Sequence, residues 1–154
     1  MNVRRAIGTE LARAQQRIRD AWGDPIVARG RDYAVGALEH CLVAGDFDGV
    51  AAFAVDDKPI CELVAIIAAT PWRGAGTALV EALRRELGDG FTQIRLTTTN
   101  DNVDALRFYQ RCGFRLTGLR PGAVDEARRH KPSIPLTGDY GIAVRDEIDL
   151  TLDL

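Results

Sequence analysis

Several features that define membrane, secreted and metal-binding proteins are scarce or missing in this 154-residue sequence. No apolar stretch approaches the roughly 18 residues that a bilayer-spanning helix requires. The first residues lack the apolar segment and the cleavage site of a secretory signal. The three cysteines, Cys41, Cys61 and Cys112, are an odd number without C-x-x-C spacing, which indicates neither a disulfide framework nor a zinc site. We therefore expect a cytoplasmic protein with reduced thiols and no membrane partner.

Neither sign of charge is in large excess. The sequence has 20 basic and 22 acidic side chains and a formal net charge of −2. A nucleic-acid-binding surface is usually basic, so we expect no nucleic-acid partner. His40 and His130 have no partners at metal-ligand spacing, and we expect no metal cofactor. With 46% hydrophobic and 27% charged residues, the composition is that of a folded chain, and the length suits one domain over residues 1–154.

The first half of the chain indicates one helix followed by three strands. Apolar residues recur at helical steps over residues 4–22, namely Ile7, Leu11, Ala14, Ile18 and Trp22. Three apolar runs with turn residues between them then predict strands at 40–45, 50–55 and 60–69. Only four residues separate the second run from the third, as in an antiparallel hairpin.

The second half indicates helices and strands in alternation, with a closing strand. We expect helices over 75–87 and 102–112, strands over 92–99, 114–118 and 145–154, and an irregular segment over 119–140. The second of these helices follows a capping cluster, Asn100-Asp101-Asn102, and ends at Gly113. The last strand alternates apolar residues with polar or charged ones, which predicts one wet face. The fold class is therefore α+β, with a mixed, mostly antiparallel central sheet flanked by helices.

A glycine-rich turn, "TPWRGAGTALV" at residues 70–80, joins the third strand to the next helix. Helix N-termini carry unpaired N–H groups and attract phosphate. A dinucleotide fingerprint beginning at Gly74 would need Gly or Ala where Leu79 stands, and a P-loop would need a lysine, which is absent between Lys58 and Lys131. An ordinary strand-to-helix turn stays open as the simpler interpretation.

Two motifs resemble those of the GNAT superfamily of N-acetyltransferases. Arg73-x-x-Gly76-x-Ala78 is similar to the acyl-CoA signature of that superfamily. A second motif, Asn102-x-x-Ala105-x-x-x-Tyr109-x-x-x-Gly113-Phe114, is similar to its cofactor-side helix. The resemblance covers roughly residues 40–118 and implies the acyl-CoA N-acyltransferase fold with acetyl-CoA as acetyl donor. The cofactor-binding residues that it implies are Ile67, Ala68, Arg73, Gly74, Ala75, Gly76, Thr77, Ala78, Asn102 and Ala105.

Acetyl transfer to an amine needs a base for the amine and an acid for the departing thiolate, and the sequence offers one candidate for each. Glu62 interrupts an apolar strand, on the same face as Val64 and Ile66 by period-two counting, so burial should raise its pKa. It lies eleven positions before Arg73, a spacing that the resemblance associates with the base of the histone-acetylating branch. The alternatives are a solvent-facing glutamate or a charge that prevents edge pairing.

Tyr109 is the candidate acid, because the resemblance gives the equivalent tyrosine that role. Its alternative is an aromatic core residue. The resemblance also places a backbone N–H near Ile67 or Ala68, at a bulge, as stabiliser of the oxyanion.

The acceptor is the least defined part of the sequence interpretation. We expect a small-molecule or peptide amine, and the resemblance allows a homodimer. A basic cluster of Arg128, Arg129, His130 and Lys131 would either contact the substrate or be merely solvated. Two other interpretations stay open, a catalytically inactive module that binds or senses acyl-CoA, and a structural domain whose glycine turn binds nothing.

Overall fold

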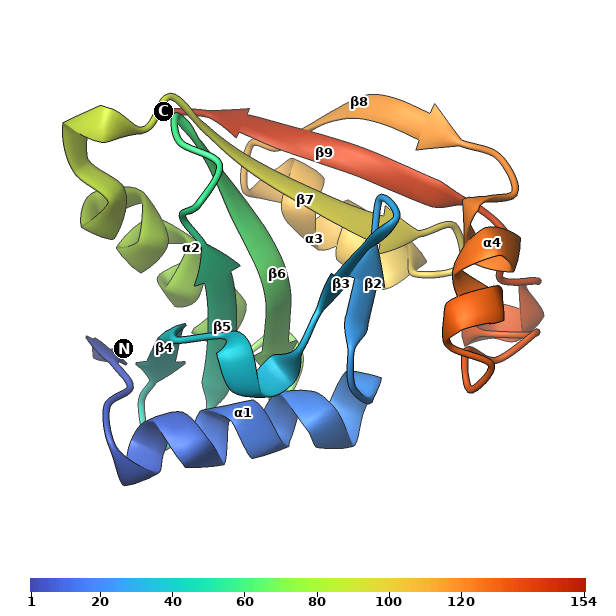
Figure 1. Ribbon diagram of the computed structural model, residues 1–154. Helices are drawn as coiled ribbons and strands as arrows, with labels where there is room; N and C mark the ends of the chain where they lie inside the picture. The colour runs from blue at the N-terminus through green and yellow to red at the C-terminus, as the bar shows by residue number, and fades with distance from the viewer. The chain divides into compact units, whose positions relative to one another are not determined.

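The chain folds into two compact units in a computed structural model that describes residues 1–154 (Figure 1). The first unit comprises Met1–Ile26, Tyr33–Ile94 and Leu154, and the second comprises Val27–Asp32 and Arg95–Asp153. Both contain mostly antiparallel strands with helices packed on them. The predicted fold class is confirmed, and the single domain stays a prediction.

The first unit is built on four antiparallel strands in the order β1-β4-β5-β6. The three predicted strands are all present. The bounds of the four are β1 Val3–Arg5, β4 His40–Ala44, β5 Gly49–Ala54 and β6 Ile60–Ala68. The unit also holds two short 3-10 helices, Val35–Ala37 and Gly88–Gly90.

The beginning of the chain differs from the prediction of a helix over residues 4–22. Val3–Arg5 forms the edge strand β1, and helix α1 runs only over Thr9–Trp22. The N-cap residue Gly8 has a φ of 57°, a left-handed value that separates strand from helix. Ala14 and Ile18 are fully buried as predicted, whereas Ile7 is 74% exposed because it lies outside the helix.

Helices α1 and α2 cover opposite faces of this sheet. Successive residues of a strand point to opposite faces. Arg4 of β1 forms an ion pair with Glu10 of α1, and its neighbour Arg5 forms one with Glu86 of α2. Helix α2 spans Ala75–Leu87, the bounds that the sequence predicts.

Helix α2 approaches the sheet closely at Gly49 of β5. A Cβ atom built on Gly49 would lie 2.9 Å from Leu79 Cδ1 and 3.1 Å from Ala75 Cβ. Only glycine leaves room for the helix at this point, so the first turn of α2 is held directly against the strand.

The second unit contains strands in the order β7-β9-β8. Strand β7 crosses from the first unit into the second, and β8 pairs antiparallel with β9. The bounds are β7 Gln93–Thr99, α3 Val103–Arg111, β8 Arg115–Arg120, α4 Ala123–His130, β9 Glu147–Asp153 and a 3-10 turn at Asp139–Gly141.

Two further elements of the chain were not predicted. A hairpin of β2 Ile26–Ala28 and β3 Arg31–Tyr33 turns at Arg29 and Gly30, with φ values of 50° and 72°. Positive φ at both central residues is the geometry of a type I′ turn. Helix α4 lies inside the segment predicted to be irregular, so that prediction was wrong for residues 123–130.

Strand β9 begins with a buried charged residue. Leu150 and Leu152 are buried as predicted. The opposite face was expected to be wet, yet Glu147 is only 4% exposed and, like Asp149, forms an ion pair with Arg120 of β8. The prediction is therefore wrong at Glu147, because Arg120 and the hairpin turn supply polar partners that the alternation of residue types cannot reveal. Asp153, at the other end of the same face, is exposed as predicted.

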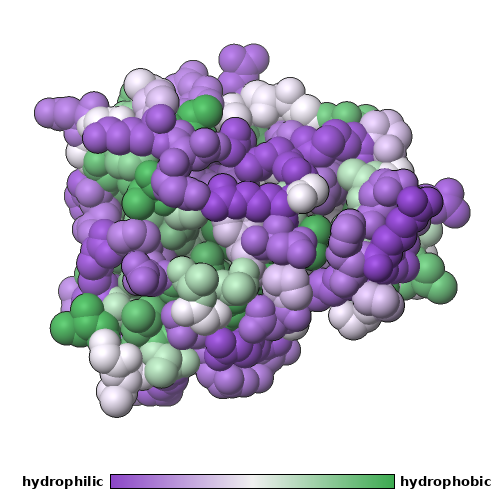
Figure 2. All heavy atoms as spheres, viewed as in Figure 1, coloured by the Kyte–Doolittle hydropathy of each residue, from purple (hydrophilic) through white to green (hydrophobic).

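None of the helices combines the length and the apolar composition that a membrane span needs. On the face seen in Figure 2, hydrophilic residues predominate and hydrophobic ones form only small groups.

Candidate active site

The glycine-rich turn is shaped by two left-handed residues. Trp72 has a φ of 66° and Gly74, the N-cap residue of α2, a φ of 90°. A Cβ atom built on Gly74 would meet nothing within 4 Å. Glycine is therefore favoured at this position by its left-handed backbone and not by a lack of space. This sharp turn leads the chain from β6 directly into the first turn of α2.

The N-terminus of α2 has no side-chain cap. The first backbone bond across this end runs from the N–H of Ala78 to the carbonyl oxygen of Gly74, at 3.0 Å. The N–H groups of Ala75, Gly76 and Thr77 precede it and have no intrahelical acceptor. Together with the positive end of the helix dipole, these donors favour an anion at this end.

Arg73 adds a positive charge beside these donors. Its side chain is exposed and forms no ion pair or hydrogen bond within the chain. Several other arginines of this unit, such as Arg4, Arg5 and Arg19, are engaged by carboxylates. The turn therefore presents an uncommitted guanidinium and free N–H groups in one short segment, a combination suited to phosphate.

Glu62 is buried in β6, opposite Ala54, and is 3% exposed. This burial contradicts the alternative of a solvent-facing glutamate. A carboxylate so removed from water requires polar partners inside the protein. Its neighbour Cys61 is also buried, and burial together with the charge of Glu62 raises the pKa of that thiol to about 12.

The face on which Glu62 lies differs from the predicted one. The register of β5 and β6 shifts between Ala52 and Phe53, so that Val64 is an extra residue on β6. Glu62 consequently shares its face with Ala65 and Ile67, and the prediction that it shares that of Val64 and Ile66 was wrong. The bulge also lies earlier than the expected position at Ile67 or Ala68.

The strand register shows which helix covers Glu62. Ile67 pairs with Val50, Val50 with Val43, and Val43 with Arg4, whose side chain forms the ion pair with α1. Residues directly opposite one another in a ladder point to the same face. Glu62 therefore lies on the α1 face of the sheet. Ile67 and Ala68, at the end of β6, are half-buried.

Helix α3 of the second unit carries the other predicted site residues. Ala105 and Tyr109 are one turn apart, and Tyr109 is the only buried residue of the helix. Its ring packs 5.4 Å from that of Phe108 and 5.6 Å from that of Phe114, measured between centroids. Burial, with a smaller contribution from Cys112, raises the pKa of Tyr109, so the phenol keeps its proton throughout the physiological pH range.

The predicted capping cluster has a different role. Asn102 is the N-cap residue of α3, but its amide donates to Thr98 Oγ1 at 3.1 Å and does not cap the helix. The Asn100 side chain accepts from the N–H groups of Arg145 and Asp146. These two side chains thus connect neighbouring segments, and the N-terminus of α3 is left without a side-chain cap.

The basic cluster at residues 128–131 is partly structural. Arg128 is 15% exposed and donates to the carbonyl oxygens of Ile134, Pro135 and Val144. It closes the loop that follows α4, a role that neither sequence interpretation foresaw. Arg129 is exposed and forms an ion pair with Glu126, as a solvated side chain does.

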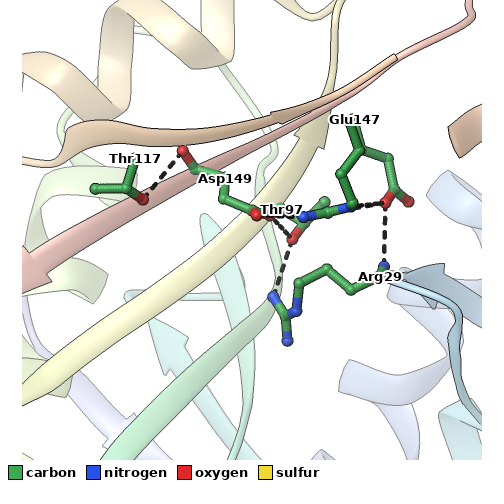
Figure 3. Close-up of polar contacts among 6 residues, drawn as sticks. Arg29, Thr97, Thr117, Glu147 and Asp149 are labelled. Atoms are coloured by element: carbon green, nitrogen blue, oxygen red, sulfur yellow. Dashed lines mark hydrogen bonds and ion pairs between the residues drawn. The ribbon is translucent and has the colours of Figure 1, made fainter. Parts of the chain in front are cut away.

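The two units thus each hold part of the predicted site. The first contains Glu62, Ile67, Ala68 and the turn from Arg73 to Ala78, and the second contains Asn102, Ala105 and Tyr109. Glu147, Asp149, Arg120, Thr97 and Arg29 form a further polar cluster in the second unit that the sequence analysis did not identify (Figure 3). No sequence motif joins them, since they come from four separate segments.

The chain belongs to the acetyltransferase (GNAT) family, whose sequence model it matches over residues 5–114. The superfamily predicted from the two motifs is confirmed.

Two proteins of Bacillus subtilis (strain 168) are similar in sequence. The uncharacterized protein YxbD is 35% identical over 137 residues, which cover 86% of each chain. The uncharacterized protein YdhI is 39% identical over 106 residues, covering 68% of this chain and 66% of that protein, just under two thirds of its length. A B. subtilis acetyltransferase solved in complex with CoA has a similar fold, with a TM-score of 0.67 at 21% identity over 99% of this chain and 98% of the other.

Proposed function

We propose that this GNAT acetyltransferase moves an acetyl group from acetyl-CoA to a primary amine. The observation that carries the proposal is the turn before α2, in which Arg73 and the unpaired N–H groups of Ala75, Gly76 and Thr77 occur together. A pyrophosphate satisfies all of these donors at once. That a structurally similar acetyltransferase was solved with CoA agrees with this choice of ligand.

In this proposal the turn binds the pyrophosphate of acetyl-CoA through backbone groups. Gly74 and Gly76 allow the backbone to approach a bulky anion, and Arg73 neutralises part of its charge. Ala78 completes the segment, Ile67 and Ala68 contribute backbone groups at the end of β6, and Asn102 and Ala105 contribute from α3. The bound thioester supplies the acetyl group.

Glu62 and Tyr109 have the two proton-transfer roles. Glu62 accepts a proton from the acceptor ammonium, directly or through water, so that the nitrogen can attack as a free amine. Tyr109 gives its proton to the sulfur as the thiolate leaves. Both side chains are buried, so bulk water competes little with them for these protons. Formation of a homodimer and location in the cytoplasm stay predictions.

The proposal is tested by incubating the purified chain with acetyl-CoA and a panel of primary amines, amino acids and short peptides. We expect release of free CoA thiol that depends on the acceptor and is matched by an N-acetylated product in the mass spectrum. Reactions without an acceptor provide the background of simple hydrolysis. Binding of acetyl-CoA without transfer to any amine in the panel would favour the acyl-CoA-sensing module instead.

A further inference from the structure

A short hairpin before β9, residues 136–144, forms a strap in the second unit. An antiparallel bridge between Thr137 and Ala143 closes the strap, and the 3-10 turn Asp139–Gly141 forms its tip. Tyr140, at this tip, is exposed and has a φ of 59°. A left-handed backbone is unusual and strained for a bulky residue. Strained residues of this kind cluster at functional sites, which indicates a role for the Tyr140 side chain.

Asp101, which lies between β7 and α3, binds the strap directly. Its side chain is buried, and its Oδ2 accepts a hydrogen bond from the N–H of Asp139 at 3.1 Å. Its other oxygen, Oδ1, accepts from the hydroxyl of Thr99. A Cβ atom built on Gly138 would lie 2.0 Å from Asp101 Oδ2, so only glycine lets the strap come this close. The strap is therefore held against the segment that leads into α3.

Tyr140 makes a second contact, with the first turn of α3. Its hydroxyl donates to the carboxylate of Asp104, at 2.9 Å from Oδ1 and 2.8 Å from Oδ2. This hydrogen bond, with the charges of Asp104 and Asp139, raises the pKa of Tyr140 against a smaller opposing effect of Arg107. The phenol of tyrosine ordinarily titrates at about 10, so Tyr140 keeps the proton that it donates throughout the physiological pH range.

Helix α3 depends on such support at its start. It has nine residues, and helices of this length are marginal in water without tertiary contacts. No side chain caps its N-terminus. Its other end is held separately, because the buried Tyr109 packs against Phe114 with 5.6 Å between ring centroids. The strap therefore supports mainly the first turn, which follows Asn102 and contains Ala105.

We propose that Tyr140 is a positioning residue, which acts through Asp104 and fixes the first turn of α3 for the binding of acetyl-CoA. The effect on acetyl-CoA rests on the proposed function, in which Asn102 and Ala105 contact the cofactor, whereas the effect on α3 does not. Loss of the strap contact should weaken acetyl-CoA binding. It should leave turnover at saturation nearly unchanged, because Tyr109 is held at the other end of the helix.

The test uses substitutions of exposed side chains, which should leave the chain folded. Tyr140→Phe removes the hydroxyl and keeps the ring, and Asp104→Ala removes the acceptor. Glu126→Ala is the matched control, because Glu126 is likewise an exposed acid in the first turn of a helix, α4, and its ion pair is with Arg129. The double variant Tyr140→Phe, Asp104→Ala should show little more effect than Asp104→Ala alone, since both changes remove the same contact.

Amide hydrogen exchange, followed by NMR without any ligand, is the first measurement. The N–H of Leu106 bonds to the carbonyl oxygen of Asn102 at 3.0 Å and reports on the first turn of α3. The N–H of Cys112 bonds to the carbonyl oxygen of Phe108 at 3.1 Å and reports on the last turn. A general loss of stability would affect both amides, whereas loss of the strap contact should affect only the first.

We expect Tyr140→Phe and Asp104→Ala each to speed exchange at Leu106 roughly three- to tenfold, the effect of one hydrogen bond. Exchange at Cys112 should stay at the wild-type rate, and Glu126→Ala should change neither amide. Unaltered exchange at Leu106 in both variants would overturn the proposal.

Isothermal titration with acetyl-CoA is the second measurement. We expect Tyr140→Phe to raise the dissociation constant roughly three- to tenfold. In turnover, KM for acetyl-CoA should rise by the same factor while kcat stays close to that of the wild type. Equal affinity of the wild type and of Tyr140→Phe would overturn the positioning role alone. Failure of the wild type itself to bind acetyl-CoA would instead reject the proposed function, and the positioning role with it.

Discussion

Substitution of Gly76 by glutamate is expected to abolish useful binding of acetyl-CoA. The new carboxylate would project from the first turn of α2, where the N–H groups of Ala75 and Thr77 have no acceptor in the chain. It would occupy these donors and repel a pyrophosphate. We expect isothermal titration to show an affinity at least about a hundredfold lower, equivalent to roughly 2.7 kcal/mol.

Folding of the Gly76→Glu variant should not suffer. An acidic residue in the first turn of a helix stabilises it by about 0.3–1 kcal/mol, so the urea unfolding midpoint should be equal to that of the wild type or higher. Gly76→Gln has the same bulk without the charge and should weaken binding less than Gly76→Glu does. Unchanged acetyl-CoA affinity in a folded Gly76→Glu variant would show that the turn is only a strand-to-helix connection.

The second large effect is expected for Glu62→Gln. Loss of the general base should lower kcat by about two to four orders of magnitude, while the dissociation constant for acetyl-CoA stays close to that of the wild type. The defect should shrink as the pH rises towards the pKa of the acceptor amine, about 10 for an alkyl amine of the lysine type. A larger fraction of the amine is then free without help from a base. Steady-state kinetics over a range of pH provide the measurement.

Glu81→Gln, an exposed glutamate on α2, is the control for the charge change. If Glu62→Gln kept wild-type kcat at neutral pH, a water chain or another group would have to serve as base. If it lost acetyl-CoA binding as well, the buried carboxylate would be a structural residue of β6.

The elements that local pattern can define were predicted well. Residues 75–87 have an apolar stripe at helical spacing and glycines at both ends, and α2 has those bounds. The apolar runs bounded by turn residues became β4, β5 and β6. In each case neighbours within a few residues decide the structure, because the periodicity and the stop signals lie in the same segment.

The parts that were missed depend on contacts between distant segments. The β2–β3 hairpin has strands of only three residues and an Arg-Gly turn. Arg29 has a left-handed backbone in this turn, and its N–H donates to Glu147 of β9. The face assigned to Glu62 was wrong because one extra residue, Val64, interrupts the alternation. Period-two counting cannot detect a bulge.

The candidate site divides in the same way. The turn from Arg73 to Ala78 is a continuous motif and was found from the sequence, whereas the cluster around Glu147 comes from four segments and was not. Glu147 was expected to be solvated because it alternates with apolar residues. In the structure it is buried and accepts hydrogen bonds from Arg29 and Arg120. A sequence motif can reveal a site made of residues that are adjacent in the chain, whereas a site formed by distant segments is seen only in the structure.

The proposed function depends on binding of the pyrophosphate of acetyl-CoA by backbone N–H groups at the start of α2. The most direct measurement follows the amide signals of Ala75, Gly76 and Thr77 by NMR while acetyl-CoA, and in parallel acetylpantetheine, is added. We expect acetyl-CoA to move these signals in a saturable way and acetylpantetheine, which has no pyrophosphate, to leave them in place. Saturable binding of acetyl-CoA with these three signals unmoved would contradict it.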